Sequence, residues 1–278
     1  FFEKSMRSGH GVLEYANGDR YAGTWLLDMR EGEGEIVYAD GDIYKGGWSG
    51  DKRSGKGIYY WIDGSYYSGE WNDDLREGIG VMFWADSTQY KGGWKSGKRD
   101  GQGVYTGKEY SYSGTWKNDR KEGNGECRFY SGDVYIGNFK NGLINGKGVY
   151  QYVNGDKYQG TFLNGQADGN GLFVWADGSE YDGDWKNNKR EGKGRMKWAN
   201  GDSYYGDWKD DKPSGSGSMA LSDGNKYRGE FSQGVVHGKG LVIEPDGTQY
   251  EGVFDNGKRV GVFIVKNSDG KEINRITY

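Results

Sequence analysis

Few residues in this chain could carry catalysis, and they are far apart in the sequence. The two histidines, His10 and His237, stand near opposite ends of the 278 residues, and Cys127 is the single cysteine. A nucleophile or general base needs a partner within hydrogen-bond reach. The sequence also lacks the Gly-x-x-x-x-Gly-Lys-Ser/Thr, Gly-x-Ser-x-Gly and His-Glu-x-x-His motifs. We therefore expect a protein that is not an enzyme, with no catalytic residues, no cofactor and no metal, and a small buried side chain at Cys127.

Charged residues offer a second chemistry, the binding of ions or of charged surfaces. Basic pairs recur along the chain: Lys52-Arg53, Lys98-Arg99, Arg120-Lys121, Lys189-Arg190 and Lys258-Arg259. A row of cations attracts anionic lipid head groups, but Asp74 and Asp119 lie in the same segments and oppose the field. Lipid binding and an ordinary solvated edge both remain open, and the second is favoured. Acidic residues such as Asp42 and Asp177 have no calcium-loop spacing, so turn formation explains them better.

An internal repeat supplies the elements that position these residues. The pattern Tyr-x-Gly-x-Trp/Phe occurs eleven times at steps of 23 residues, with one step of 22. Its tyrosines are Tyr21, Tyr44, Tyr67, Tyr90, Tyr112, Tyr135, Tyr158, Tyr181, Tyr204, Tyr227 and Tyr250. A fixed period of this size indicates a linear array in which each unit buries its face against its neighbours. Residues as distant as the two histidines cannot share a site in such an array.

Composition excludes several classes of protein. Glycine supplies 53 residues and proline only 2, which fits neither collagen nor a proline-rich disordered chain. An aromatic content of 16% is too high for disorder. No apolar run is long enough for a membrane helix. A net charge of −4 argues against nucleic acid as a partner, and one cysteine favours a reducing, cytoplasmic compartment.

Each period has the pattern of a β-hairpin. The Asp-Gly pair at 40–41 predicts a tight type I′ turn, because such turns need positive φ angles. In the returning strand, Tyr44, Gly46 and Trp48 are two residues apart and therefore point to one face. The outgoing strand adds further apolar residues to that face. The sequence thus predicts a sheet with one aromatic face and one largely polar face.

These features resemble the MORN (membrane occupation and recognition nexus) repeat family, whose unit is likewise a Tyr-x-Gly-x-Trp strand followed by a Gly-x-Gly strand. The resemblance covers nearly the whole chain. It implies an all-β fold, an elongated single-layer antiparallel sheet of about twelve stacked 23-residue β-hairpin repeats twisted into a trough. The family often carries histidine before Gly-x-Gly, a slot that only His237 matches here. Residues such as Glu31, Glu77 and Asp168 fill it elsewhere, and we expect them to accept hydrogen bonds from loop amides.

We interpret residues 1–278 as one continuous array. Phe2 stands in the aromatic slot of a hairpin whose tyrosine would precede residue 1, so the chain starts inside a repeat, as a fragment of a longer polypeptide does. Residues 255–278 lose the pattern, which predicts a degenerate C-terminal cap. The segment 106–112 is one residue short, so we expect a bend or a change of register there, either as tolerated drift or as a functional kink.

Candidate partner contacts lie on both faces. The aromatic face carries four tryptophans that we expect at the floor of the trough: Trp61, Trp84, Trp175 and Trp198. The opposite face carries apolar residues in consecutive hairpins: Ile58, Tyr60, Val81, Phe83 and Val104. Cross-strand neighbours of this kind form an exposed apolar patch. A partner surface and ordinary strand-forming residues are equally good explanations of that patch.

Two classes of function follow from the resemblance. The leading one is a non-catalytic protein-binding scaffold that organises a cytoskeletal or ciliary assembly in the cytoplasm, similar to radial spoke head proteins of the axoneme. Such a scaffold grips a helix or an extended segment of a partner along a rigid β trough. The alternative is a regulatory or membrane-apposing module that binds anionic lipid, attached to a membrane anchor or kinase domain outside this chain.

Overall fold

The computed structural model describes the backbone of residues 2–3 and 6–278 and the side chains of residues 6–278, so the slot expected for the Phe2 side chain lies outside the described residues. The fold is all-β, an open antiparallel sheet built from repeats of about 23 residues, as predicted. Its strands are β1 (Phe2–Glu3), β2 (Met6–Arg7), β3 (Gly9–Glu14), β4 (Arg20–Leu26), β5 (Met29–Val37), β6 (Ile43–Ser49), β7 (Lys52–Tyr60), β8 (Tyr66–Asn72), β9 (Leu75–Phe83), β10 (Gln89–Lys95), β11 (Lys98–Thr106), β12 (Tyr110–Lys117), β13 (Arg120–Phe129), β14 (Val134–Lys140), β15 (Leu143–Gln151), β16 (Lys157–Leu163), β17 (Gln166–Val174), β18 (Glu180–Lys186), β19 (Lys189–Lys197), β20 (Ser203–Lys209), β21 (Lys212–Ala220), β22 (Lys226–Ser232), β23 (Val235–Ile243), β24 (Gln249–Asp255), β25 (Lys258–Lys266) and β26 (Glu272–Thr277).

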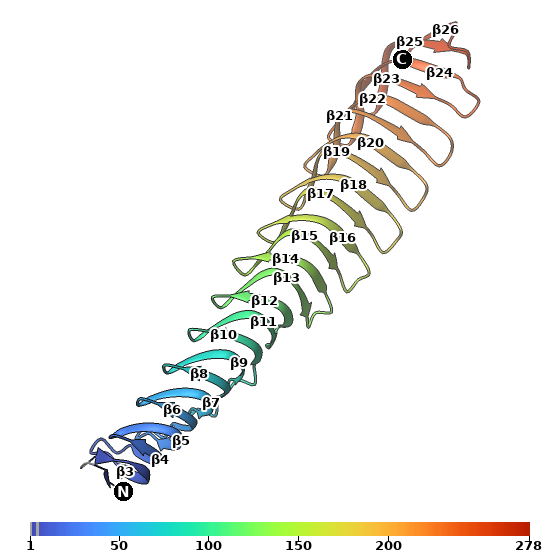
Figure 1. Ribbon diagram of the computed structural model, residues 1–278. Coiled ribbons are helices and arrows are strands. Elements are labelled where there is room, and N and C mark those ends of the chain that lie inside the picture. The colour runs from blue at the N-terminus through green and yellow to red at the C-terminus, as the bar shows by residue number, and fades with distance from the viewer. Residues whose placement is uncertain (1, 4–5) are drawn as a thin grey trace. The chain divides into compact units, whose positions relative to one another are not determined.

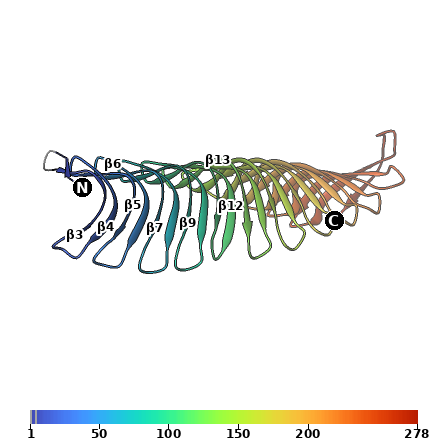
Figure 2. The ribbon, with the colours of Figure 1, turned by 60° about the horizontal axis from the view of Figure 1, so that its bottom comes forward.

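The chain divides into two compact units, one of residues 1–132 with 138–143 and the other of residues 133–137 with 144–278. Strands β1 and β2 form a separate two-stranded sheet. From β3 onward, strands of one unit that follow one another in the sequence lie side by side and pair antiparallel (Figure 1). Figure 2 shows that strands β3 to β9 of the first unit are curved rather than flat. Each hairpin therefore contacts chiefly the hairpins before and after it, which is the organisation expected of a linear array.

The Asp-Gly turns differ from the predicted type. At residues 39–41 the amide of Gly41 donates to the Tyr38 carbonyl at 3.0 Å, and the amide of Tyr38 donates to the Asp42 carbonyl at 2.9 Å. Only Gly41 has a positive φ, of 97°, whereas a type I′ turn needs two such residues. The prediction of type I′ turns was therefore wrong here. The connection is a three-residue loop whose third residue occupies the left-handed region.

Type I′ geometry occurs instead at the opposite edge of the sheet. Gly50 and Asp51, between the paired residues Ser49 and Lys52, have φ angles of 53° and 68°. Leu27 and Asp28 repeat this geometry with 49° and 68°. Asparagine, aspartate and glycine fill most of these positions because they tolerate the left-handed region.

The repeated glycines make room for the tyrosine rings. Gly46 and Gly57 pair across β6 and β7, and the Tyr44 ring lies directly on them. A Cβ atom added at Gly57 would approach the Tyr44 hydroxyl oxygen to 2.3 Å, so no other residue fits. The Tyr44 hydroxyl donates to the carbonyl of Gly47 at 2.9 Å, which satisfies the one polar atom of this fully buried side chain.

Edge-to-face contacts link each hairpin to the next. Tyr44 lies 5.2 Å from Trp48 of its own strand and 5.4 Å from Trp71 of the following repeat, at interplanar angles of 88° and 82°. The Trp71 indole also donates to the Gly57 carbonyl at 3.2 Å. We call the row of buried tyrosines and tryptophans the aromatic ladder. It confirms the predicted aromatic face, and the T-shaped geometry is the one that aromatic quadrupoles prefer.

The shortened segment keeps the register of its neighbours. Tyr105 faces Tyr112 and Thr106 faces Ser111 across β11 and β12, without interruption. The turn absorbs the deletion, because the amide of Gly107 donates to the Tyr110 carbonyl at 2.9 Å and closes a shorter connection. The change of register considered for residues 106–112 was therefore wrong, and the bend considered as its alternative stays a prediction.

Phe263 explains why the pattern changes after residue 254. Its ring is fully buried and packs edge-to-face on Phe254 and Tyr278, at 5.2 and 5.3 Å. A Cβ atom added at Gly252 would approach this ring to 2.6 Å. A phenylalanine from the outgoing strand thus fills the space over Gly252 that a tyrosine of the returning strand fills elsewhere.

Candidate partner-binding site

The five apolar residues predicted on the polar side do lie on the face opposite the aromatic ladder, here called the outer face, where Val104 of β11 lies opposite Lys91 and Ser113. Ile58 and Tyr60 are on β7, and Val81 and Phe83 are on β9. Strand β8 lies between them, and each pair shares one partner on it. Ile58 and Val81 both oppose Ser68. The two pairs are therefore not direct cross-strand neighbours.

Tyr66 on β8 joins the two aromatic members. It opposes Tyr60 on one side and Phe83 on the other. Its ring lies 6.2 Å from the Tyr60 ring and stacks on the Phe83 ring at 5.5 Å with an interplanar angle of 18°. Tyr60 remains 39% exposed. Three aromatic rings thus form one continuous surface over three strands.

The surface extends toward the N-terminus through Ile43 and Val37, which follow as consecutive cross-strand partners. We call this row the outer stripe, and its members in strand order from β5 to β9 are Val37, Ile43, Tyr60, Tyr66 and Phe83. Arg20 and Gln89 flank its two ends. Ile58 and Val81 lie beside it in the next row. A half-buried apolar row of this length, bounded by polar residues, is typical of an interaction surface.

Sequence reasoning missed three members of the outer stripe, although the signal was present. Tyr66, Ser68 and Glu70 alternate with the ladder residues of β8, so Tyr66 must lie on the outer face. Ile43 and Val37 directly precede or follow core positions and obey the same period of two. Tyr66 was overlooked because Tyr67 follows it directly, and two consecutive tyrosines show no alternation of polar and apolar residues.

The four predicted tryptophans are divided between the two units. Trp61 and Trp84 belong to the first unit, and Trp175 and Trp198 belong to the second. Each is half-buried, and its backbone amide closes the adjacent turn, as in the 2.9 Å bond from Trp61 to the Ser65 carbonyl. The Trp61 ring packs on Tyr59 at 4.7 Å and the Trp175 ring on Phe173 at 4.6 Å. They cover the turn end of the ladder, and a partner contact there stays a prediction.

Many cations of the loop edge are turned inward. The guanidinium of Arg53 lies 4.4 Å from the centre of the Trp71 ring, and its Nε donates to the Asp74 carboxylate at 2.9 Å. The Arg53 amide donates to the same carboxylate oxygen at 3.0 Å, and the Asp74 amide donates back to the Arg53 carbonyl at 3.1 Å. The same arrangement holds for four further pairs: Arg7–Asp28, Arg30–Asp51, Arg99–Asp119 and Arg190–Asp211. We call this arrangement the arginine clasp, and it joins one repeat to the next.

Three further cations of the loop edge, Arg76, Lys121 and Arg259, are half-buried and lie over the rings of Trp94, Tyr110 and Tyr250. Lys52, Lys98, Lys189, Lys258 and Arg120 are exposed, and two of these lysines pair with nearby carboxylates. Lys52 lies 3.2 Å from Asp73, and Lys189 lies 2.8 Å from Asp210. The hydrogen bond from Lys189 lowers the pKa of Asp210. The basic row therefore presents far less free positive charge than the sequence suggests, which weakens the case for lipid binding.

The slot that often holds histidine in the family now has an observed role. The carboxylates of Glu31 and Glu77 accept hydrogen bonds from the amides of Gly50 and Ser96 in the next turn, at 2.9 and 2.8 Å. The equivalent carboxylates of Glu122, Asp100, Asp168 and Glu191 do the same at 2.9 to 3.4 Å. The expected hydrogen bonds to loop amides are confirmed, so carboxylates can take this slot.

The residues considered for catalysis are divided between the two units or are buried. His10 and His237 belong to different units. Cys127 is fully buried opposite Tyr112, and burial raises the pKa of its thiol, as expected for a small core residue. Asp42 accepts hydrogen bonds from the Ile62 amide and the Tyr59 hydroxyl. Among the described residues, no three histidine, cysteine or acidic side chains gather as metal ligands would.

The family assignment rests on the whole chain. The model of the MORN repeat matches twelve consecutive segments: residues 1–20, 21–43, 44–66, 67–89, 90–111, 112–134, 135–157, 158–180, 181–203, 204–226, 227–249 and 250–262. The chain belongs to the MORN repeat family. Each matched segment from residue 21 to residue 249 begins at a tyrosine of the ladder, so the features that define this MORN array are those that hold its core. Among the described residues, no helix has the length and apolarity to cross a membrane.

Solved structures show only partial likeness to this MORN array, and no curated protein matches it. The TCP domain of SAS-4 from Drosophila melanogaster, in complex with a proline-rich motif of Ana2, is 14% identical and has a TM-score of 0.33. That match covers 62% of this chain and 86% of the other. The TCP10 domain of CPAP from Danio rerio is 11% identical over 96% and 100% of the two chains, with a TM-score of 0.22.

Proposed function

We propose that this chain is a non-catalytic scaffold that binds a partner protein through the outer stripe and thereby organises a cytoskeletal or ciliary assembly. Membership of the MORN family points to a repeat scaffold that binds protein or associates with membrane. Of these two alternatives, the outer stripe favours the binding of protein. Its rings are not needed to fill the core, because the aromatic ladder on the other face is already closed by its own contacts.

The stripe suits a segment of a partner that lies across several strands. Tyrosine and phenylalanine are the residues that interfaces favour, because they bury much area with little loss of side-chain freedom. Tyr60, Tyr66 and Phe83 already contact one another, so little ordering is needed when a partner covers them. The flat, contiguous rings favour the apolar side of a helix or strand over a small molecule.

Lipid binding is the competing function, and charge reversal distinguishes it. Arg99 is unsuitable for this test, because its guanidinium is held by Asp119 and lies 4.3 Å from the Trp116 ring. Lys98 and Arg120 are exposed at the same edge and are better probes. Reversal of both should abolish binding to phosphatidylserine vesicles if the array binds anionic lipid.

The test compares two double variants of the full chain. Tyr60→Asp with Phe83→Asp places charges in the stripe without touching the ladder, and we expect it to fold normally and to lose its protein partners. Lys98→Glu with Arg120→Glu should keep them. We would recover partners from native cells with the wild-type chain and measure direct binding to each purified partner. Unchanged protein binding by the stripe variant, together with vesicle binding that only the charge variant loses, would overturn the scaffold in favour of the membrane module.

A further inference from the structure

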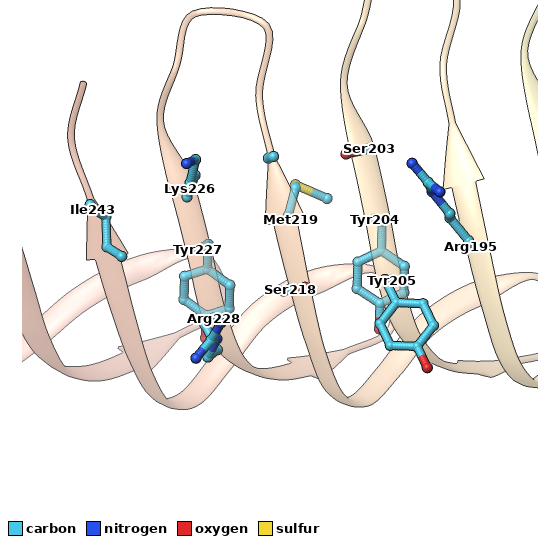
Figure 3. A pocket seen from close by; sticks show the side chains of 11 residues that line it. Arg195, Ser203, Tyr204, Tyr205, Ser218, Met219, Lys226, Tyr227, Arg228 and Ile243 are labelled. Atoms are coloured by element: carbon cyan, nitrogen blue, oxygen red, sulfur yellow. The ribbon is translucent and has the colours of Figure 1, made fainter. Parts of the chain in front are cut away.

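A hollow lies on the outer face of the second unit, over strand β21. Its floor is made of small residues two positions apart, Ser216, Ser218 and Ala220. Tyr205 of β20 and Arg228 of β22 are the cross-strand partners of Ser218 and stand on either side of it. The cavity over Ser218 measures about 490 Å³ (Figure 3). We call this feature the β21 groove.

The groove exists because one repeat lacks a large side chain. The positions equivalent to Ser218 in other hairpins of the second unit hold Leu172 and Leu241. A neighbouring hollow of similar size continues the groove along the strand and shares Tyr205, Ser218 and Arg228 with the first. Three alternate residues of one strand span roughly 13 Å, a length that matches an extended peptide of about four or five residues.

Positive charge is concentrated around the groove. Arg195, Lys226 and Arg228 line the cavity over Ser218, and none of its lining residues is acidic. Within residues 6–278 none of these three cations takes part in a salt bridge. The continuing hollow adds Lys193 and Lys239 and one acidic residue, Glu230, whose carboxylate accepts a hydrogen bond from the Lys239 amide at 3.3 Å. The nearby carboxylate of Asp207 is occupied, because it pairs with Lys193 and accepts a hydrogen bond from the Ser216 amide at 3.0 Å.

We infer that the β21 groove binds an acidic extended segment of a partner protein. The three cations form no salt bridge with any described residue and lie beside the Tyr205 ring and the hydroxyls of Ser216 and Ser218. They complement carboxylates on an extended chain. A membrane surface fits less well, because Asp182 is the cross-strand partner of Arg195, and Glu251 lies two strands beyond Arg228 in the same row of the outer face. A flat anionic membrane would face both carboxylates, whereas an extended segment that follows β21 lies three strands from each. This site is separate from the outer stripe, which lies in the first unit.

The test measures the fluorescence anisotropy of a labelled peptide that alternates glutamate with leucine. The wild-type chain should bind it. A peptide with glutamine in place of glutamate should bind at least about tenfold more weakly. Arg195→Gln with Arg228→Gln should weaken binding by a similar factor. Lys45→Gln with Lys91→Gln is the matched control, since both lysines occupy the position of Arg228 in other hairpins.

A second variant tests the groove rather than the charge. Ser218→Leu should fold, because Leu172 and Leu241 occupy this position in other repeats of the second unit, and it should block the peptide by filling the floor. The stripe variant Tyr60→Asp with Phe83→Asp should bind the peptide normally, which separates this inference from the proposed scaffold function. The inference is overturned if the wild-type chain fails to bind the acidic peptide, or if folded Ser218→Leu binds it as tightly as the wild type. It is also overturned if the groove variants lose binding to phosphatidylserine vesicles but keep binding to the peptide.

Discussion

At the scale of single residues, the repeated tyrosine has three roles that explain the Tyr-x-Gly-x-Trp pattern. Its ring covers the paired glycines, its edges contact two aromatic rings, and its hydroxyl donates to a backbone carbonyl. Tyr67 shows all three, because it lies 5.1 Å from Trp71, 5.3 Å from Trp94 and 3.0 Å from the Glu70 carbonyl oxygen. The pattern is therefore a description of one packed unit rather than of a binding motif.

Removal of a ladder ring should be far more damaging than removal of its polar neighbour. We expect Trp71→Ala to lower the free energy of unfolding by about 3–5 kcal/mol, because a buried ring leaves a cavity. Glu70→Ala on the outer face should lower it by less than about 1 kcal/mol. Chemical denaturation of both variants measures the difference. Equal losses would contradict the assignment of the two faces.

The arginine clasp should stabilise more than an exposed ion pair one residue away. Arg53→Ala removes the contact with Trp71 and leaves the Asp74 carboxylate with one donor fewer, and we expect a loss of about 1–3 kcal/mol. Lys52→Ala breaks only the exposed pair with Asp73 and should cost at most about 0.5 kcal/mol. The comparison uses the midpoint of urea unfolding. A larger effect at Lys52 would show that the clasp is not a structural element.

At the scale of elements, the sequence predicted the hairpins and their two faces but misplaced the turn type. The Asp-Gly pair was read as a type I′ turn, whereas the loop has three residues and needs one positive φ angle, as at Gly64. Ser87 takes that position at 70° in one hairpin. The number of residues in the loop decides between the two geometries. That number depends on which residues of the two strands pair last, and the sequence alone does not give this register.

The type I′ turns of the other edge predict that reverse substitutions at two equivalent positions change the free energy of unfolding in opposite directions. Leu27 has a φ of 49°, which costs a leucine more than an asparagine. Leu27→Asn should raise the free energy of unfolding by about 0.5–1 kcal/mol. Asn187, at the equivalent position with the same φ of 49°, provides the reverse test, since Asn187→Leu should lower it. Thermal melts that move in the same direction for both variants would contradict the turn assignment.

At the scale of the whole molecule, the candidate site was predictable in part. Composition and alternation placed Ile58 and Phe83 on the outer face, and the structure agrees. Tyr66 was missed although it alternates with the ladder residues of β8, because the adjacent Tyr67 obscures the period. The inward direction of Arg53 could not be predicted, because a basic pair does not reveal which member faces the ladder. The β21 groove depends on small side chains beside large ones on neighbouring strands, which only the register of the sheet brings together.

Burial of many tyrosines makes the whole array sensitive to alkali. Burial raises the pKa of Tyr21, Tyr90, Tyr158 and Tyr227 to about 12, from an ordinary value of 10.0. The unfolded chain therefore loses these protons first. The stability from neutral buried phenols is complete below pH 10 and falls as the pH rises from 10 toward 12. Urea unfolding at increasing pH, followed by tyrosinate absorbance, should show this decline, and stability that stays constant across that range would contradict it.

The central claim is that the aromatic ladder on one face of the sheet stabilises the fold and that the outer face binds the partner. Two adjacent residues test it most directly. Tyr59 packs on Trp61 at 4.7 Å and donates to Asp42 at 2.7 Å, whereas Tyr60 lies on the outer face with its ring 6.2 Å from that of Tyr66. We would measure the melting temperature and the partner affinity of Tyr59→Asp and Tyr60→Asp in parallel. The account predicts a large fall in melting temperature for Tyr59→Asp, and a wild-type melting temperature with at least about tenfold weaker partner binding for Tyr60→Asp. A stable Tyr59→Asp, or a Tyr60→Asp that binds the partner as the wild type does, would contradict it.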